Sequence, residues 1–255
     1  MAITSLSAAV AANQANSPSK APNSADAVAS VLQKADKRIQ EQRDLAAVQL
    51  SAFGKLKSSF SDVQASARAL SDTKQTATNA GITKAANNFV KAFNNAAGAA
   101  RSAAQNGAPA QGSRARAAQS DLARSISADA TATAALKKIG ITQQQDGTLA
   151  IDANKFQAAL NANPEAVRST LSTIGQQVDQ TATRELASTG NIGRTVNSLD
   201  NRAKGLENQQ ADQQAQAAAA QAVLSAQTVR LNNVVNSQNT NPTTGAAAYL
   251  RIFST

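Results

Sequence analysis

Residues 53–70 read FGKLKSSFSDVQASARAL, and apolar side chains recur along this stretch at alternating steps of three and four residues. That spacing puts them on one face of a helix and is typical of a coiled-coil seam. The same register extends back to Val28 without a skip. Its positions are Val28, Leu32, Ala35, Ile39, Gln42, Ala46, Gln49, Phe53, Leu56, Phe60, Val63, Ala67 and Leu70. We therefore predict a long helix over residues 25–70, preceded by a flexible leader over residues 1–24 that contains Pro18 and Pro22.

A second heptad run occupies the C-terminal part of the chain and predicts a helix over residues 191–240, followed by a tail over residues 241–255. Its positions are Ile192, Val196, Leu199, Ala203, Leu206, Gln210, Gln213, Ala217, Ala220, Leu224, Gln227, Leu231 and Val234. Both runs have Gln and Ala in their middle. An antiparallel pairing of the two helices would set Gln against Gln and satisfy the side-chain amides.

The larger apolar side chains of the two runs form the predicted seam for helix pairing and oligomerisation. They are Ile39, Phe53, Leu56, Phe60, Val63, Leu70, Ile192, Val196, Leu199, Leu206, Leu224 and Leu231. The partner that fills such a seam can be the other terminal helix or a neighbouring subunit. We expect an intrachain pair that also contacts neighbours.

The region between the two runs predicts a small helical body. Polar residues 71–81, closed by Gly81, indicate a linker. A helix is expected over residues 82–105, with Phe89, Val90 and Phe93 on one face, and another over residues 113–136.

One strand signal lies in this body, at residues 139–151, where Asp146-Gly147 separates two stretches rich in β-branched residues. Asp152 is then suited to cap a helix that runs to Leu160, and Asn163-Pro164 to open the next one. The body therefore spans residues 82–190, with one hairpin at 139–151. The fold class is mainly α: a long antiparallel coiled coil of the N- and C-terminal helices, plus a small helical body with one β-hairpin.

The composition removes most kinds of catalytic site. The chain has no Cys and no His, and aromatic residues make up 3%. Thiol nucleophiles, the common zinc ligands and the usual general base are thereby excluded. The Gly-rich nucleotide-binding motifs and the nucleophile elbow are also missing from the sequence. Asp146-Gly147 fits a turn better than a calcium loop, which needs a series of acidic ligands. We expect no enzyme, no catalytic residue, no metal and no cofactor.

A formal net charge of +9 raises the question of nucleic-acid binding. The excess lies mostly in residues 75–151, with eight basic and three acidic side chains, but no aromatic residues alternate with the basic ones as in a nucleic-acid surface. No run of about 18 apolar residues is present, and no basic residue precedes the weakly apolar start of the chain. We therefore expect no nucleic-acid partner, no membrane partner and no cleaved signal peptide.

Several stretches resemble the bacterial flagellar filament-cap protein family, also called flagellar hook-associated protein 2. Residues 49–58, QLSAFGKLKS, continuing to Leu70, resemble its N-terminal helix, and residues 88–94, NFVKAFN, resemble the helix that opens its C-terminal region. Residues 139–142 with 146–152, followed by 163–167, are similar to its hairpin-and-helix signature. Gly190-Asn191-Ile192 and Tyr249-Leu250 fit its C-terminal helix and tail.

The resemblance implies a structural protein that leaves the cell by the flagellar type III export route. It implies a homo-oligomer at the filament tip that guides flagellin into place. The implied partners are other copies of the chain, flagellin, other flagellar axial proteins and an export chaperone. The family carries large β-rich head domains between its N-terminal helix and the Phe-Val helix, whereas that interval here is only residues 71–87. The chain resembles a form of the family without these heads.

Overall fold

The structure is a computed structural model that describes residues 24–72 and 77–239. The side chains of residues 24–28, 235 and 237–239 are also left undescribed. The predicted leader, apart from Ser24, and the predicted tail lie outside the described residues. The chain divides into two compact units, one formed by residues 1–42 with 206–255 and the other by residues 43–205. We refer to them as the terminal unit and the body unit.

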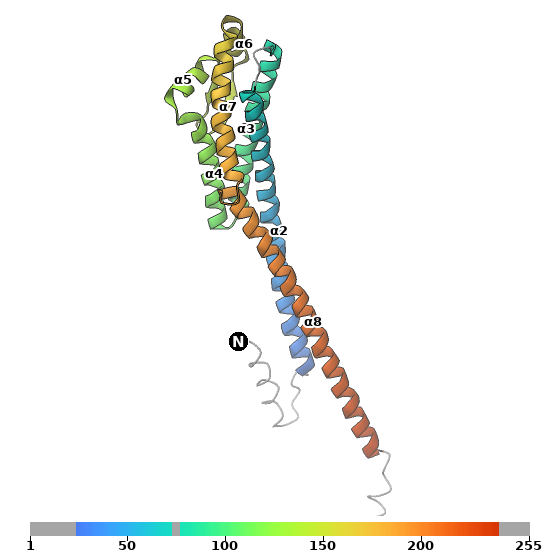
Figure 1. The fold of residues 1–255 in the computed structure, drawn as a ribbon. Helices are drawn as coiled ribbons and strands as arrows, with labels where there is room; N and C mark the ends of the chain where they lie inside the picture. The colour runs from blue at the N-terminus through green and yellow to red at the C-terminus, as the bar shows by residue number, and fades with distance from the viewer. Residues whose placement is uncertain (1–23, 73–76, 240–255) are drawn as a thin grey trace, which may run out of the picture. The chain divides into compact units, whose positions relative to one another are not determined.

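The described chain is mainly helical (Figure 1). In chain order the elements are α2 (Ser24–Ser71), α3 (Asn79–Asn106), α4 (Pro109–Ser127), α5 (Ala130–Lys138), β1 (Ile141–Gln143), β2 (Leu149–Ile151), α6 (Ala153–Ala162), α7 (Pro164–Leu186) and α8 (Asn191–Asn239). Two long helices flank shorter ones and a single hairpin, so the predicted fold class is confirmed. None of the described helices combines the length and the apolar character needed to cross a membrane.

Two boundaries in the body differ from the sequence prediction. α3 begins at Asn79 rather than at residue 82, because Thr78 caps it and its hydroxyl accepts a hydrogen bond from the Gly81 N–H at 3.2 Å. Gly81 therefore lies in the first helical turn and does not close a linker that reaches residue 81. The single helix expected over residues 113–136 is also wrong. It is divided into α4 and α5 by Asp129, whose carboxylate accepts from the N–H groups of Thr131 and Ala132.

The starts of α6 and α7 follow directly from the sequence. Asp152 caps α6 through the Lys155 N–H at 3.0 Å, and Asn163 caps α7 through the Ala166 N–H at 3.0 Å. Pro164 is the first residue of α7, where its missing N–H is no loss. These local signals fix where the chain turns inside the body unit.

The body unit is built around a bundle of α2, α3, α4 and α7. α3 packs on α4, and α4 packs on α7. α7 runs antiparallel to the second half of α2, and Gln64 and Arg68 hydrogen-bond to Thr183 and Asp179 across this pair at 2.6 and 2.8 Å. The backbones come close at Gly175, where an added Cβ would lie 2.5 Å from the Ala67 carbonyl oxygen. Glycine thus permits the close approach of the two helices.

The hairpin pairs β1 and β2 antiparallel, with Ile141 opposite Ile151 and Gln143 opposite Leu149. In the turn the Gly147 N–H donates to the backbone carbonyl oxygen of Gln144 at 3.0 Å, and Gly147 has a φ of 81°. This left-handed conformation suits glycine, which explains why Asp-Gly signals the turn. The hairpin contacts α3 and α5, so it belongs to the body unit.

The terminal unit contains two antiparallel helical segments, residues 24–42 of α2 and 206–239 of α8 (Figure 1). Ile39 and Leu206 are its buried apolar residues in the described part. Leu32 and Asp36 of α2 line a shared depression with Ala217 of α8 and its glutamine neighbours. The small Ala and Gln side chains give this unit far less apolar core than the body unit.

Candidate functional site

The predicted seam residues of α2 within the body unit lie in one core. Phe53, Leu56, Phe60, Val63 and Leu70 are fully buried and belong to the hydrophobic cluster of the bundle. Burying a side chain of this size contributes about 1.5–3 kcal/mol. In the isolated chain these five residues therefore act first as structural core, whereas their role in oligomerisation stays a prediction.

The predicted seam residues at the start of α8 reach the same core. Ile192 and Leu199 are buried in the cluster, and Val196 packs against it while partly exposed. In the terminal unit, Ile39 and Leu206 are buried and Leu224 is half-buried. Leu231 is 64% exposed, so the structure does not bring it together with the rest of the seam.

Further apolar side chains on the terminal unit face solvent in this single chain. The large ones are Val31, Val223, Val229, Leu231 and Val234. Except for Leu231 and Val234, they lie outside the heptad register and were missed by the sequence analysis. A search for a second apolar position beside the seam would have found them. Exposed groups of apolar residues are often places where another molecule binds.

The body unit also exposes Leu45 and Val48, which are 50% and 54% accessible. They lie three residues apart on α2 and therefore share one face of the helix. The buried residues Ala46 and Gln49 follow each of them directly and point to another face. α2 thus has an apolar face outside the seam, which the heptad analysis did not detect.

The predicted pairing of side-chain amides fails at two glutamines of the seam. Gln42 is exposed, whereas Gln49 is buried. The side-chain oxygens of Gln49 and Gln213 are both buried without a hydrogen-bond partner among the described residues. The expectation that the amides satisfy each other fails at these two oxygens. An unsatisfied buried acceptor costs about 1–3 kcal/mol, so both positions favour a donor from elsewhere.

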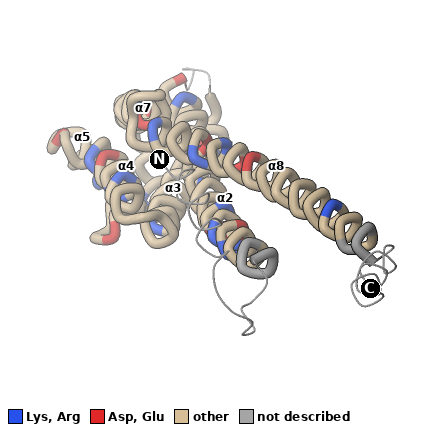
Figure 2. Tube along the Cα trace, turned by 90° about the horizontal axis from the view of Figure 1, so that it is seen from below, with Lys and Arg blue, Asp and Glu red and all other residues tan. Residues whose placement is uncertain are grey.

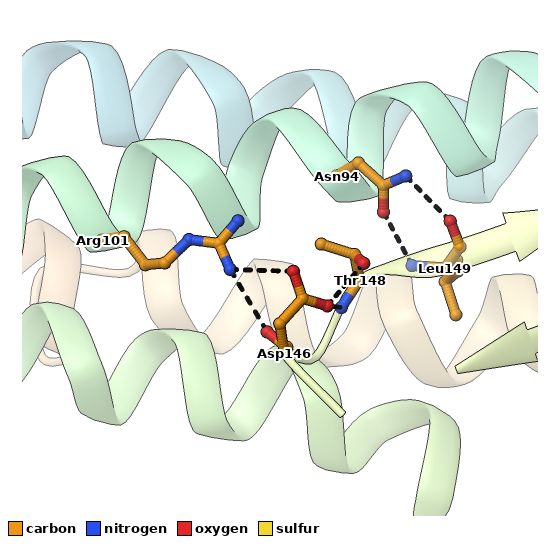
Figure 3. A network of polar contacts seen from close by, with 5 residues as sticks. All are labelled: Asn94, Arg101, Asp146, Thr148 and Leu149. Carbon is orange, nitrogen blue, oxygen red and sulfur yellow. Dashed lines mark hydrogen bonds and ion pairs between the residues drawn. The ribbon is translucent and has the colours of Figure 1, made fainter. Parts of the chain in front are cut away.

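A polar network fastens the hairpin to α3 (Figure 3). The Asn94 amide accepts from the Leu149 N–H at 2.7 Å and donates to the Leu149 carbonyl at 2.9 Å, as a further β-strand would. Arg101 donates to the Asp146 carboxylate and carbonyl at 3.2 and 3.3 Å. The sequence analysis missed Asn94 as an anchor, although it lies in the NFVKAFN stretch.

The same network fixes the charge of Asp146. The Thr148 hydroxyl and the Thr148 N–H donate to its carboxylate, and these bonds, with help from Arg101, lower the pKa of Asp146. The carboxylate is therefore ionised at neutral pH. Its donors come from the turn itself and from α3, which is the arrangement of a turn and not of a calcium loop.

Neither metal chemistry nor a basic stripe stands out in the described part of the chain. Residues 24–72 and 77–239 contain no group of three or more acidic, His or Cys side chains that could hold a metal ion. Figure 2 shows Lys and Arg spread over several helices and interspersed with Asp and Glu. The exposed apolar helix faces, such as that of Leu45 and Val48, are the candidate functional surfaces among the described residues.

Comparison with protein-family models gives a match to a flagellar family. The family model described as flagellar hook-associated protein 2 C-terminus matches residues 71–240, which is two thirds of the chain. No curated protein and no solved structure matches the chain. The matched region begins at the end of α2 and includes the hairpin, the caps of α6 and α7, and α8. The chain therefore belongs to the flagellar hook-associated protein 2 family of structural flagellar proteins.

Proposed function

We propose that this chain is a secreted flagellar structural protein of the filament-cap type, which oligomerises at the filament tip and assists flagellin assembly. The observation that carries the proposal is the family match over residues 71–240. Its partners would be further copies of the chain, flagellin and other flagellar axial proteins, with an export chaperone before secretion. No catalytic step is part of this role.

The exposed apolar side chains support assembly with other subunits. Leu45 and Val48 on the body unit, and Val223 and Leu231 on the terminal unit, keep half or more of their surface in water. Because roughly half of each side chain is already covered, burying the rest at an interface would contribute about 0.8–2 kcal/mol before the cost of association. We propose that the seam and these neighbouring faces are used together. The buried seam residues pack inside the bundle, and the exposed apolar side chains contact other subunits.

The chain would carry out this role without head domains. α2 ends at Ser71 and α3 begins at Asn79, so residues 72–78 alone connect them. The part of the cap that such head domains would supply would then have to be formed by the bundle itself. This makes self-association the first property to measure.

Sedimentation velocity of the purified full-length chain tests self-association. A closed oligomer of several subunits is expected at micromolar concentration. The variant Leu45→Ser/Val48→Ser should lower its mass, and Glu207→Gln, at an exposed position of α8, serves as control. A wild-type chain that stays monomeric at all concentrations, alone and with flagellin, would contradict the proposal.

Cells that lack the protein test the capping step. Electron microscopy should show filaments that are short or missing, and unassembled flagellin should accumulate in the medium. Normal filament length without released flagellin would favour the second candidate, a non-capping axial or junction component or another type III secreted coiled-coil protein. The net charge leaves a DNA-binding role as a third candidate, and the absence of a gel shift at low salt would dismiss it.

A further inference from the structure

A polar cavity lies in the body unit where α4, the end of α7 and the start of α8 meet. It has a volume of about 710 Å³. Its charged lining residues are Asp121 and Arg124 from α4, Arg184 and Glu185 from α7, and Arg194 from α8. Neither the family match nor the proposed assembly role uses this cavity.

Glu185 is the unusual member of this group, because it is only 6% exposed. Its Oε1 accepts a hydrogen bond from the Asn191 side-chain amide at 3.2 Å. Its Oε2 is fully buried, and no donor among the described residues reaches it. A buried carboxylate oxygen without a donor is costly, so the ionised form of Glu185 is poorly accommodated here.

Glu185 also has an acidic neighbour, Asp121. Asp121 lines the same cavity, and its carboxyl acts on the Glu185 carboxyl both as a negative charge and as a hydrogen-bonding group. Two carboxylates cannot hydrogen-bond to each other unless one of them carries a proton. Burial raises the pKa of Glu185, and the negative charge of Asp121 raises it further, against the opposing effect of the Asn191 hydrogen bond.

The arginines around the cavity are turned to other acceptors. Arg124 donates to Asp121 at 3.2 Å and to Ser120 at 3.4 Å. Arg184 donates to the Thr181 hydroxyl at 3.2 Å, and Arg194 donates to the Thr189 carbonyl at 2.8 Å. Asp121 thus has a hydrogen-bonded arginine, whereas no arginine of the cavity is hydrogen-bonded to Glu185 among the described residues. The proton is therefore expected on Glu185.

We propose that Glu185 and Asp121 share one proton, which sits on Glu185 Oε2 and joins α7 to α4 as a carboxylic acid–carboxylate hydrogen bond. The protonated acid gives the buried oxygen its missing partner and removes one of two facing negative charges. Because Asn191 binds the other oxygen of Glu185, the same group also holds the start of α8. Deprotonation would remove this hydrogen bond and weaken the contacts among α4, α7 and the start of α8. We call the Glu185–Asp121 pair the pH-sensitive clasp.

The direction of the pH effect follows from the raised pKa. Folding favours the protonated form of Glu185. The clasp therefore contributes fully to the stability of the fold below the pKa of Glu185 in the unfolded chain, near 4.5. This contribution is lost as the pH rises through the higher pKa of Glu185 in the folded chain. Replacing Glu185 by Gln supplies a neutral side chain that can donate to Asp121 at every pH. The Glu185→Gln variant should therefore equal the wild type at pH 4 and melt a few degrees higher at pH 8.

The experiment combines thermal melting of the full-length chain from pH 4 to pH 8 with carboxyl-carbon NMR titration of Glu185. Asp121→Asn should bring the titration midpoint of Glu185 closer to 4.5, because it removes the like charge and adds a donor. Glu207→Gln, an exposed glutamate on α8, is the matched control and should melt like the wild type at every pH.

A midpoint at or below 4.5 for Glu185 in the wild type would overturn the proposal. The proposal would also be overturned if the melting temperature of Glu185→Gln changed with pH in the same way as that of Glu207→Gln. A bound cation in place of the proton is tested by adding magnesium or calcium chloride at pH 8 and constant ionic strength. A rise in melting temperature that Glu185→Gln abolishes would also overturn the shared proton. Neither readout depends on whether the protein caps a filament.

Discussion

The body unit and the terminal unit both have apolar residues at heptad spacing, but they bury these residues to different extents. In the body unit every large apolar seam residue of α2, from Phe53 to Leu70, is fully buried against several helices. In the described part of the terminal unit the seam has two helical segments, and its positions Leu231 and Val234 remain exposed. Heptad spacing selects a helix face, whereas the number and size of the neighbours decide how much of that face leaves water.

The largest effect is expected from the core of the body unit. The double variant Phe53→Ser/Phe60→Ser removes two fully buried rings, and each loss should cost about 3–5 kcal/mol, enough to unfold the bundle. Circular dichroism should show a large loss of helical signal.

The matched change in the terminal unit is Val223→Ser/Leu231→Ser. Both side chains are exposed, so the melting of the bundle should stay as in the wild type, whereas the mass of the oligomer should fall. Equal losses of helicity in the two double variants would refute the contrast between the units.

The next effect comes from the close contact of α2 and α7. In Gly175→Ala the added methyl would meet the Ala67 carbonyl oxygen at 2.5 Å and Leu70 Cβ at 3.1 Å. The helices would have to separate, which should cost about 1–3 kcal/mol. Urea unfolding measures the loss, and a midpoint equal to that of the wild type would show that the two helices are free to move apart.

An effect of similar size is expected where the hairpin meets α3. Asn94→Ala leaves the N–H and the carbonyl of Leu149 without their partner and should cost about 2 kcal/mol. Arg101→Ala removes a solvated ion pair of the same network and should change stability much less. Hydrogen exchange of the Leu149 N–H should rise in the first variant and stay slow in the second. The reverse order would mean that the ion pair is the true anchor.

The smallest effect is expected at Gly205, the last residue of the body unit on α8. No atom lies within 4 Å of a Cβ added there, so Gly205→Ala should stabilise the helix by about 0.5–1 kcal/mol. Thermal melting monitored at 222 nm should show a small upward shift. A downward shift would indicate that the open conformation of glycine is needed at this point.

Much of the fold could be predicted because the deciding signals are local. The heptad runs, Asp152 and Asn163 as caps, and Asp146-Gly147 as a turn act through residues at most a few positions apart. The break between α4 and α5 was missed because an Ala-rich sequence hides the capping role of Asp129.

The contacts of the candidate surfaces were harder to predict. Gly175 against Ala67, Asn94 against Leu149, and Glu185 against Asp121 each join residues more than fifty positions apart. A repeating pattern of residues along the sequence carries no information about contacts between such distant positions. The exposure of Leu231 was missed for a related reason, since a heptad position says which way a side chain points and not whether a neighbour is present.

The short connection between α2 and α3 has a consequence for how such proteins diversify. Residues 72–78 join two helices whose ends are already held, α2 by its hydrogen bonds to α7 and α3 by the Thr78 cap. A whole domain can be gained or lost at such a junction without altering the packing on either side. By this argument the bundle should keep its packing when a domain is inserted into residues 72–78. The same position is a natural place to graft a foreign domain onto this bundle.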